Sequence, residues 1–211
     1  MMGSRNRLIV MCRQPRFGQG KQRLAREAGQ LAAWRFQKIA LAELLHRLQA
    51  PREWRLVVAV TPDAAARGSG RWASNHPRRP QGHGDLGQRM LNLLAPPPGR
   101  KGAALLVGSD VPGIDPATVR RAFFLLRRHD WVLGPADDGG FWAIGARCRP
   151  WRRPDFSGVA WGSKSVLQDT RARLPESLVL LEQRYDVDDA PALQRWQAER
   201  LKISSAVRHA P

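Results

Sequence analysis

Short apolar segments alternate with helical patterns along most of the chain, and this alternation restricts the fold more than any other feature. Each apolar segment is bounded by polar, glycine or proline residues, as buried strands usually are. Strands that alternate with helices form a mostly parallel sheet with helices on both faces, so we expect an α/β protein. The predicted strands are Leu8–Cys12, Leu56–Val60, Ala104–Gly108, Trp131–Leu133 and Phe141–Ile144.

The segments between these strands carry helical signals. Residues 31–49 place leucines three and four positions apart, which is typical of a helix with one buried face. Pro116 follows Asp115, a residue type that favours the helix N-cap, and predicts a helix over 116–128. Residues 66–84 lack such patterns and are expected to form a mobile loop. Further helices are predicted at 85–94 and 164–174, with a short one after Pro191.

Length and composition limit how the chain is organised. With 211 residues and 43% hydrophobic content, the chain can form one domain with its own core. We expect a single domain over 1–211, with a core at about 7–197 and a C-terminal tail at 198–211. The apolar runs are too short to span a membrane or to act as a signal peptide, so a cytoplasmic protein is expected. Cys12 and Cys148 show neither metal-site spacing nor a disulfide framework.

The chain carries a formal net charge of +17, which is typical of nucleic-acid-binding proteins. The excess is arginine scattered along the chain, and only residues 147–154 combine dense arginine with tryptophan. A basic surface also attracts a phosphorylated small molecule. Nucleic-acid binding therefore stays a distant alternative, and the sequence leaves the oligomeric state open.

The sequence GSDVPGI, residues 108–114, follows the apolar run AALLV and places Asp110 where a strand ends. Ligands of open α/β sheets bind at the carboxyl ends of the strands, and a carboxylate held there suits a metal ion. Aspartate, proline and glycine are also ordinary residues for ending a strand. The motif by itself leaves both interpretations open.

The loop RQPRFGQGKQRLA, residues 13–25, combines glycines and cations directly after the first predicted strand. Glycines let backbone N–H groups approach a phosphate, and a lysine or arginine neutralises its charge. The loop is not a Walker A motif, because Gln22 stands where serine or threonine is required. It also lacks the dinucleotide pattern, since Arg23 follows Gly18 and Gly20. Phosphate binding and an ordinary surface turn are equally supported by this loop alone.

Glycine and aspartate also occur together in GHGDLGQRM, residues 82–90. Asp85 as a helix N-cap, with Gly84 and Gly87 as turn residues, accounts for this pattern without a ligand.

Two later loops concentrate carboxylates. In PADDGGFWAIG, residues 135–145, two adjacent aspartates exceed what a turn requires, which favours a functional role. In YDVDDAP, residues 185–191, Asp186 and Asp188 would face the same way in an extended chain, although a simple acidic helix cap is the alternative.

Taken together, these segments resemble a bacterial family of nucleotide-diphospho-sugar transferases with the GT-A fold. Its members are often described as selenodomain-associated or arsenosugar-biosynthesis glycosyltransferases. The likeness is collinear from near residue 8 to about residue 193, and it is far more specific for membership than for the reaction. The matching blocks are CRQPRFGQGKQRL (12–24), QGHGDLGQR (81–89), GSDVPGI (108–114), PADDGGFWAIG (135–145), WGS (161–163) and DVDDAPAL (186–193).

The resemblance implies a single-domain, Rossmann-like, three-layer α/β/α sandwich. It implies a Mg²⁺ or Mn²⁺ ion held by Asp110 and Asp188, with Asp110 also serving catalysis. Asp138 matches the aspartate that faces the presumed donor-sugar or acceptor pocket, and is the second implied catalytic residue. The residues implied in nucleotide binding are Pro15, Gly18, Lys21, Arg23, Gly84, Asp85 and Gly87.

The chain also departs from the family pattern. Gln22 replaces a threonine, Phe141 a tyrosine and Gly162 a serine, while Arg13 stands where the family has lysine. None of these changes removes a carboxylate of the implied metal site. The changes at residues 22 and 141 leave the choice of donor and acceptor open.

The sequence therefore predicts an enzyme that transfers a sugar from a nucleotide-diphospho-sugar to a small-molecule acceptor. Breaking the sugar–phosphate bond builds negative charge on the leaving oxygens, which a divalent cation stabilises. Nucleotidyl transfer, which joins a nucleoside triphosphate to a phosphorylated small molecule, is the alternative. The fold cannot separate the two reactions.

Overall fold

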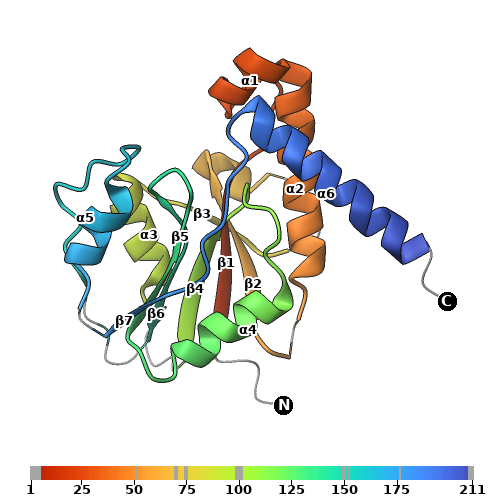
Figure 1. The fold of residues 1–211 in the computed structure, drawn as a ribbon. Coiled ribbons are helices and arrows are strands. Elements are labelled where there is room, and N and C mark those ends of the chain that lie inside the picture. The colour runs from red at the N-terminus through yellow and green to blue at the C-terminus, as the bar shows by residue number, and fades with distance from the viewer. Residues whose placement is uncertain are drawn as a thin grey trace.

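The computed structural model describes residues 6–50, 52–68, 71–73, 76–97, 102–148, 151, 153–175 and 177–208, without the side chains of residues 71 and 203–208. The described residues form an α/β fold with a seven-stranded sheet between helices (Figure 1). The strands are β1 (Arg7–Arg13), β2 (Arg55–Thr61), β3 (Arg78–Pro80), β4 (Ala103–Gly108), β5 (Trp131–Pro135), β6 (Phe141–Arg147) and β7 (Leu178–Leu180). The helices are α1 (Gln22–Ala28), α2 (Gln30–Arg47), α3 (Leu86–Leu94), α4 (Pro116–Leu125), α5 (Val166–Ala172) and α6 (Ala190–Arg208), with 3₁₀ turns at Asp63–Ala66 and Arg71–Ala73.

The sheet is mostly parallel, as predicted. Its strand order is β3-β2-β1-β4-β6-β5-β7, and only β6 runs antiparallel to its neighbours β4 and β5. Because β6 is reversed, its first residue lies at the edge of the sheet where β1, β4 and β5 end. Loops from four strands therefore meet at one edge, which is where α/β sheets bind ligands.

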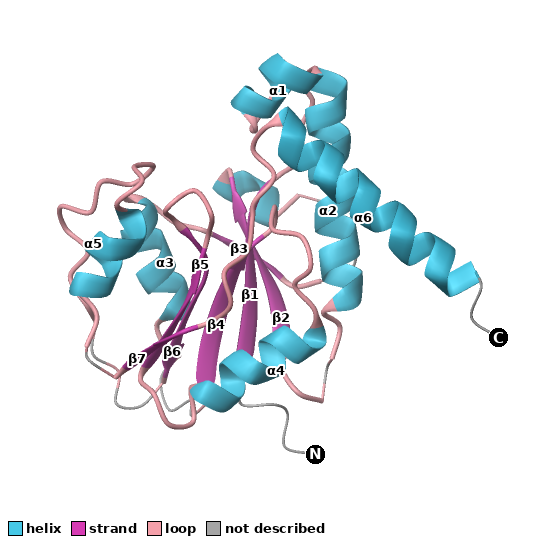
Figure 2. Ribbon diagram, in the orientation of Figure 1, coloured by secondary structure: helices cyan, strands magenta, loops and turns pink. Residues whose placement is uncertain are grey.

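Both faces of the sheet are covered by helices (Figure 2). Leu8 and Val10 of β1 belong to the core that includes α2 and α4, whereas Ile9 belongs to the core that includes α3. This alternation follows from the two-residue period of a strand, and it accounts for continuous apolar strands that are buried on both faces. The result confirms the predicted three-layer α/β/α sandwich.

A third apolar cluster joins α1, α2 and α6 beyond the edge of the sheet where β1, β4 and β5 end. It contains Leu24, Phe36, Val187 and Trp196, and the Phe36 and Trp196 rings meet edge to face with centroids 4.9 Å apart. Figure 1 shows α1 and the start of α6 together at this end of the molecule. This cluster holds the C-terminal segment against the loop that follows β1.

The five predicted strands are all present, but two edge strands were not predicted. β3 lies inside the segment 66–84, where a mobile loop was expected, and it pairs in parallel with β2. Its sequence, Arg-Arg-Pro, has no apolar alternation, because a short edge strand buries little side-chain surface. Residues 69, 70, 74 and 75 of that segment lie outside the described part. β7 is equally short and pairs with β5.

The helix after the last acidic loop was expected to be short, and this was wrong. α6 runs from Ala190 to Arg208 and so extends beyond the expected end of the core at residue 197. Its first turns pack into the third apolar cluster through Leu193 and Trp196, which anchor a helix whose own apolar pattern is weak. Among the described residues, none of the helices combines the length and apolar character needed to cross a bilayer.

Candidate functional site

Asp110 lies just beyond β4, which ends at Gly108 in the middle of the sheet. Beside it, the turn between β5 and β6 carries Asp137 and Asp138. The Asp138 carboxylate accepts a hydrogen bond of 2.8 Å from the backbone N–H of Gly140 and thereby closes its own turn. Gly139 has φ 90°, and a Cβ there would lie 2.3 Å from the backbone oxygen of Lys164. Only glycine fits this position, so the glycine pair serves a close backbone approach as well as the turn.

A segment far away in sequence brings two further carboxylates to Asp110. After β7 the chain runs along β5, and the backbone N–H of Val187 donates a 3.1 Å hydrogen bond to the backbone oxygen of Asp110. Val187 is fully buried in the third apolar cluster. Since neighbouring residues of an extended chain point to opposite sides, the residues before and after it, Asp186 and Asp188, turn towards Asp110. One ligand oxygen from each of the three aspartates lies within 4.8 Å of the others.

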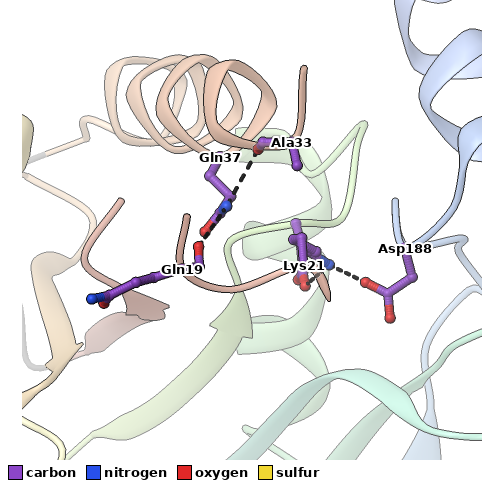
Figure 3. Close-up of polar contacts among 6 residues, drawn as sticks. Gln19, Lys21, Ala33, Gln37 and Asp188 are labelled. Carbon is purple, nitrogen blue, oxygen red and sulfur yellow. Dashed lines mark hydrogen bonds and ion pairs between the residues drawn. The ribbon is translucent and has the colours of Figure 1, made fainter. Parts of the chain in front are cut away.

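The loop between β1 and α1 places a cation in this acidic cluster. The Lys21 ammonium lies 2.5 Å from a carboxylate oxygen of Asp110 and also contacts the Asp188 carboxylate (Figure 3). Burial opposes the charged form of Lys21, but the carboxylates of Asp110 and Asp188 outweigh it and raise the pKa of the ammonium. Burial likewise opposes ionisation of Asp110, yet the charge and hydrogen bond of Lys21 keep its pKa below the ordinary value.

Asp186 takes no part in these ion pairs, and its pKa is raised above the ordinary value of an aspartate. Burial is the largest cause that raises it, followed by the negative charges of Asp188, Asp110 and Asp138, and together they bring the pKa to about 7. Three carboxylates that crowd together in this way favour a bound cation, because a positive charge relieves their repulsion.

The loop that carries Lys21 is held in shape by α2. Gly18 and Gly20 have φ 76° and 74°, values that glycine adopts readily. The Gln37 amide of α2 donates hydrogen bonds to the backbone oxygens of Gln19, at 3.2 Å, and Ala33, at 3.3 Å (Figure 3). A Cβ at Gly20 would lie 2.8 Å from the Gln37 side chain. The glycines therefore let the loop pass close to α2 while it delivers Lys21 to the aspartates.

A cavity of about 1100 Å³ opens beside the acidic cluster. Its lining includes the aspartates of the cluster as well as the apolar side chains of Leu86, Met90, Phe141 and Trp161. The Cys12 thiol also lines it, but burial, aided by the charge of Asp110, raises the pKa of this thiol to about 12. Cys12 is therefore unsuited to act as a nucleophile. The cavity therefore offers both charged and apolar groups to a ligand.

The predicted site residues fall into two groups. Asp110, Asp138, Asp188 and Arg23 line the cavity, and Lys21 contacts two of these aspartates. Arg23 pairs with Asp189 at 3.1 Å and with Glu27 at 3.2 Å. The remaining predicted nucleotide-binding residues are not among those that line the cavity: Pro15, Gly18, Gly84, Asp85 and Gly87.

Two of these residues have clear structural contacts. Asp85 is the N-cap of α3 and accepts a 2.8 Å hydrogen bond from the backbone N–H of Gln88. Gly87 is buried under the Trp161 ring, and a Cβ at Gly87 would lie 2.4 Å from a ring carbon. The small residue at this position thus determines where the indole stands in the wall of the cavity.

Sequence analysis did not select Asp186 and Trp161 as site residues. The alternation Asp-Val-Asp was visible, and in the structure it places both aspartates beside Asp110 and the valine in the core. Trp161 belongs to a block that matched the family, but nothing in the sequence shows that it packs on Gly87, 74 positions away along the chain.

Comparison with known proteins identifies the family to which the chain belongs. Residues 44–163 match the model of a family described as "Uncharacterized protein conserved in bacteria (DUF2064)". The chain belongs to this family. A comparison with curated proteins gives no significant match.

Solved structures of other proteins share the fold. A proposed nucleotide-diphospho-sugar transferase from Desulfovibrio desulfuricans G20 has a TM-score of 0.77 and 26% identity, over 88% of this chain and 83% of that chain. The 4-diphosphocytidyl-2C-methyl-D-erythritol synthase from Anaerococcus prevotii DSM 20548 has a TM-score of 0.52 and 9% identity, over 94% of this chain and 100% of that chain. The second likeness concerns the fold alone. Together they show that the family member described here has the fold of nucleotide-diphospho-sugar transferases.

Proposed function

We propose that this protein is a metal-dependent transferase that uses a nucleotide-diphospho-sugar as donor. The observation that carries the proposal is the convergence of Asp110, Asp186 and Asp188 at the carboxyl edge of the sheet, beside a cavity large enough for such a donor. The chain has a net charge of +17, yet this part of its surface concentrates carboxylates. An acidic site in a basic protein favours a cation as its first ligand.

The three aspartates fit a hard divalent cation. Mg²⁺ and Mn²⁺ prefer oxygen ligands, and Mg²⁺ is usually held by one or two carboxylates together with water and substrate phosphates. The Lys21 ammonium already bridges two of the three, which shows that the cluster accepts positive charge. A bound cation would neutralise the diphosphate leaving group.

The loop from β1 to α1 supplies positive charge for the diphosphate. Lys21 lies within the cluster, and the Arg23 guanidinium lines the cavity next to it. Both pairs that Arg23 forms are exposed, so the guanidinium can exchange them for a phosphate at little cost. We assign these two residues to the diphosphate, while the glycines of the loop let it pass close to α2 and so bring Lys21 to the site.

Asp138 is assigned to the reacting end of the donor. It lies close enough to Asp186 to raise the pKa of that carboxyl, although burial and two other aspartates have larger effects. It lines the cavity at the β5–β6 turn. This position supports a role for Asp138 in contacting the donor sugar or in taking the proton of an acceptor hydroxyl. Trp161 and Phe141 offer the apolar faces against which a sugar ring or an acceptor packs.

The test compares two reaction mixtures by phosphorus NMR. The first contains nucleotide sugars of several bases with a panel of hydroxyl acceptors, and the second contains nucleoside triphosphates with sugar phosphates, each with Mn²⁺ or with EDTA. We expect metal-dependent release of nucleoside diphosphate in the first mixture. Pyrophosphate from the second mixture, with no turnover in the first, would refute glycosyl transfer and establish nucleotidyl transfer instead. Asp110→Asn is the matched inactive control.

A further inference from the structure

Lys21 occupies an unusual position for a residue assigned to a substrate phosphate. Its ammonium is directed at two of the three clustered carboxylates, with a side chain only 12% exposed. The two carboxylates, by contrast, are 37% and 52% exposed. The ammonium therefore contacts two of the three carboxylates that are proposed to hold a divalent cation.

The backbone holds Lys21 there at some cost. Lys21 has φ 45° and ψ 47°, the left-handed conformation, and it is the N-cap residue of α1. Among the residues that the structure describes, it is the one non-glycine residue with positive φ. Such a conformation is unfavourable for a residue with a Cβ and persists where surrounding contacts stabilise it. These contacts are the ion pairs of the Lys21 ammonium and the hydrogen bond that the Gln37 amide donates to the backbone oxygen of Gln19.

We propose that Lys21 is a built-in cation that fills the metal position until a diphosphate arrives, so that metal and nucleotide bind cooperatively. The inference rests on the metal site of the proposed function. A metal ion that enters alone must displace the ammonium, which loses two charge-assisted hydrogen bonds. A diphosphate bound at the same time offers the ammonium new anionic partners.

This exchange couples the two ligands. Because each lowers the cost of binding the other, metal and nucleoside diphosphate raise each other's affinity by the same factor. Metal alone would bind weakly, and the carboxylates would stay neutralised in the free protein. Lys21 would thus keep the acidic site from attracting cations unproductively in the absence of donor.

The experiment measures Mn²⁺ binding without any turnover. Free Mn²⁺ is followed by electron paramagnetic resonance during titration of nucleotide-free wild-type protein, Lys21→Met and the control Lys38→Met. Lys38 is a suitable control because it lies on neighbouring α2 and stacks over Trp34, 4.5 Å from the ring centroid, rather than on an aspartate. We expect Lys21→Met to bind Mn²⁺ on the order of 10- to 100-fold more tightly than wild type. Lys38→Met should match wild type.

A second arm tests the coupling. The titrations are repeated with whichever of ADP, GDP, CDP and UDP binds best, and the Mn²⁺ that the nucleotide itself complexes is subtracted. The nucleotide should strengthen Mn²⁺ binding to wild type by tenfold or more and to Lys21→Met by far less. In wild-type protein, saturating Mn²⁺ alone should also increase acetylation of Lys21 relative to Lys38, read by mass spectrometry. This last measurement needs no variant and stands even where Lys21→Met fails to fold.

Aspartate variants distinguish the role of Lys21 from the existence of the metal site. Asp186→Asn removes a carboxylate that Lys21 does not touch and should weaken Mn²⁺ binding in both backgrounds. Equal Mn²⁺ affinity of Lys21→Met and wild type, together with that weakening, would overturn the role of Lys21 while the metal site stands. Mn²⁺ binding unaffected by Asp186→Asn, Asp110→Asn and Asp188→Asn would refute the metal site, and this inference with it.

Discussion

Replacing Gly87 by alanine should displace Trp161 and so test whether the indole forms a working wall of the cavity. Gly87 lies in the first turn of α3, where alanine is normally favoured over glycine by up to about 1 kcal/mol. Here an added Cβ would lie 2.4 Å from the Trp161 ring and 3.0 Å from the Cβ of Phe156. Ordinary carbon contacts begin near 3.5 Å, so the ring must move by about 1 Å.

Whether Gly87→Ala stabilises or destabilises the protein depends on the cost of over-packing against Trp161 and on the gain in helix propensity. Over-packing of this kind costs typically about 1–3 kcal/mol, which exceeds the gain in helix propensity. We expect a net loss of about 1–2 kcal/mol, which for a chain of this size lowers the melting temperature by roughly 2–8 °C. The displaced indole should reduce transfer to the acceptor, while nucleoside diphosphate affinity stays within about twofold because the metal and phosphate groups are untouched.

A double-mutant cycle gives the decisive measurement. In a Trp161→Ala background the ring is gone, and the helix propensity gained by alanine offsets the remaining close approach to Phe156, so Gly87→Ala should be close to neutral in thermal unfolding. The coupling between the two substitutions should therefore be about 1–2 kcal/mol. Gly87→Ala that stabilises the wild-type background, or costs the same in both backgrounds, would refute the argument that Gly87 seats Trp161.

Three shorter predictions concern the aspartates. Asp110→Asn should keep the fold and abolish Mn²⁺-dependent binding of nucleoside diphosphate, measured by calorimetry; loss of folding would show a structural role instead. Asp138→Asn keeps an oxygen to accept the Gly140 N–H, so it should spare nucleotide affinity and reduce turnover by about 10²–10⁴. In the folded protein, burial and then the charge of Asp188 raise the pKa of Asp186 to about 7, whereas in the unfolded chain the pKa is about 3.8. The folded state without metal is therefore stabilised at low pH by the proton on Asp186, and this stability is lost as the pH rises through 7. In EDTA, Asp186→Asn should therefore raise the melting temperature more at pH 8 than at pH 5, and an equal gain at both would contradict the raised pKa.

The sequence predicts those parts of the fold that bury large apolar surface. Each central strand is a continuous apolar run, and α2 and α4 have apolar faces that pack on the sheet, so all of them were predicted within a few residues. β3, with the sequence Arg-Arg-Pro, is held by backbone pairing at the sheet edge, and its side chains give no apolar pattern that could predict it. β7 does carry apolar residues, and Leu178 and Val179 pack against the two main clusters, but the strand is only three residues long and was not selected from the sequence. The length of α6 was not predicted because its apolar pattern is short: among its described residues, only Leu193 and Trp196 are buried in the core.

The candidate site was predictable where its residues lie on recognisable strand ends. Asp110 and Asp138 follow apolar strands, and the sheet topology then brings them to one edge. Asp186 escaped because its role depends on Val187, whose burial and backbone hydrogen bond to Asp110 decide which side of the segment faces the site. Those contacts span 77 positions of sequence between residues 110 and 187, and no local pattern records them.

Net charge alone does not identify the ligand of the candidate site, because charge acts locally at a site. The arginine excess suggested nucleic acid, yet many of these arginines pair with carboxylates or stack on rings at the surface, as Arg120 does with Glu53 and Arg195 with Tyr185. The carboxylates at the edge of the sheet are in contact with a buried lysine, and at this short range their field exceeds that of distant arginines, which salt screens beyond about 8–10 Å. The scattered arginines can still speed the approach of an anionic donor. Under the proposed function, the donor then meets a cluster of aspartates neutralised by Lys21, and its diphosphate is expected to bind there only together with a cation.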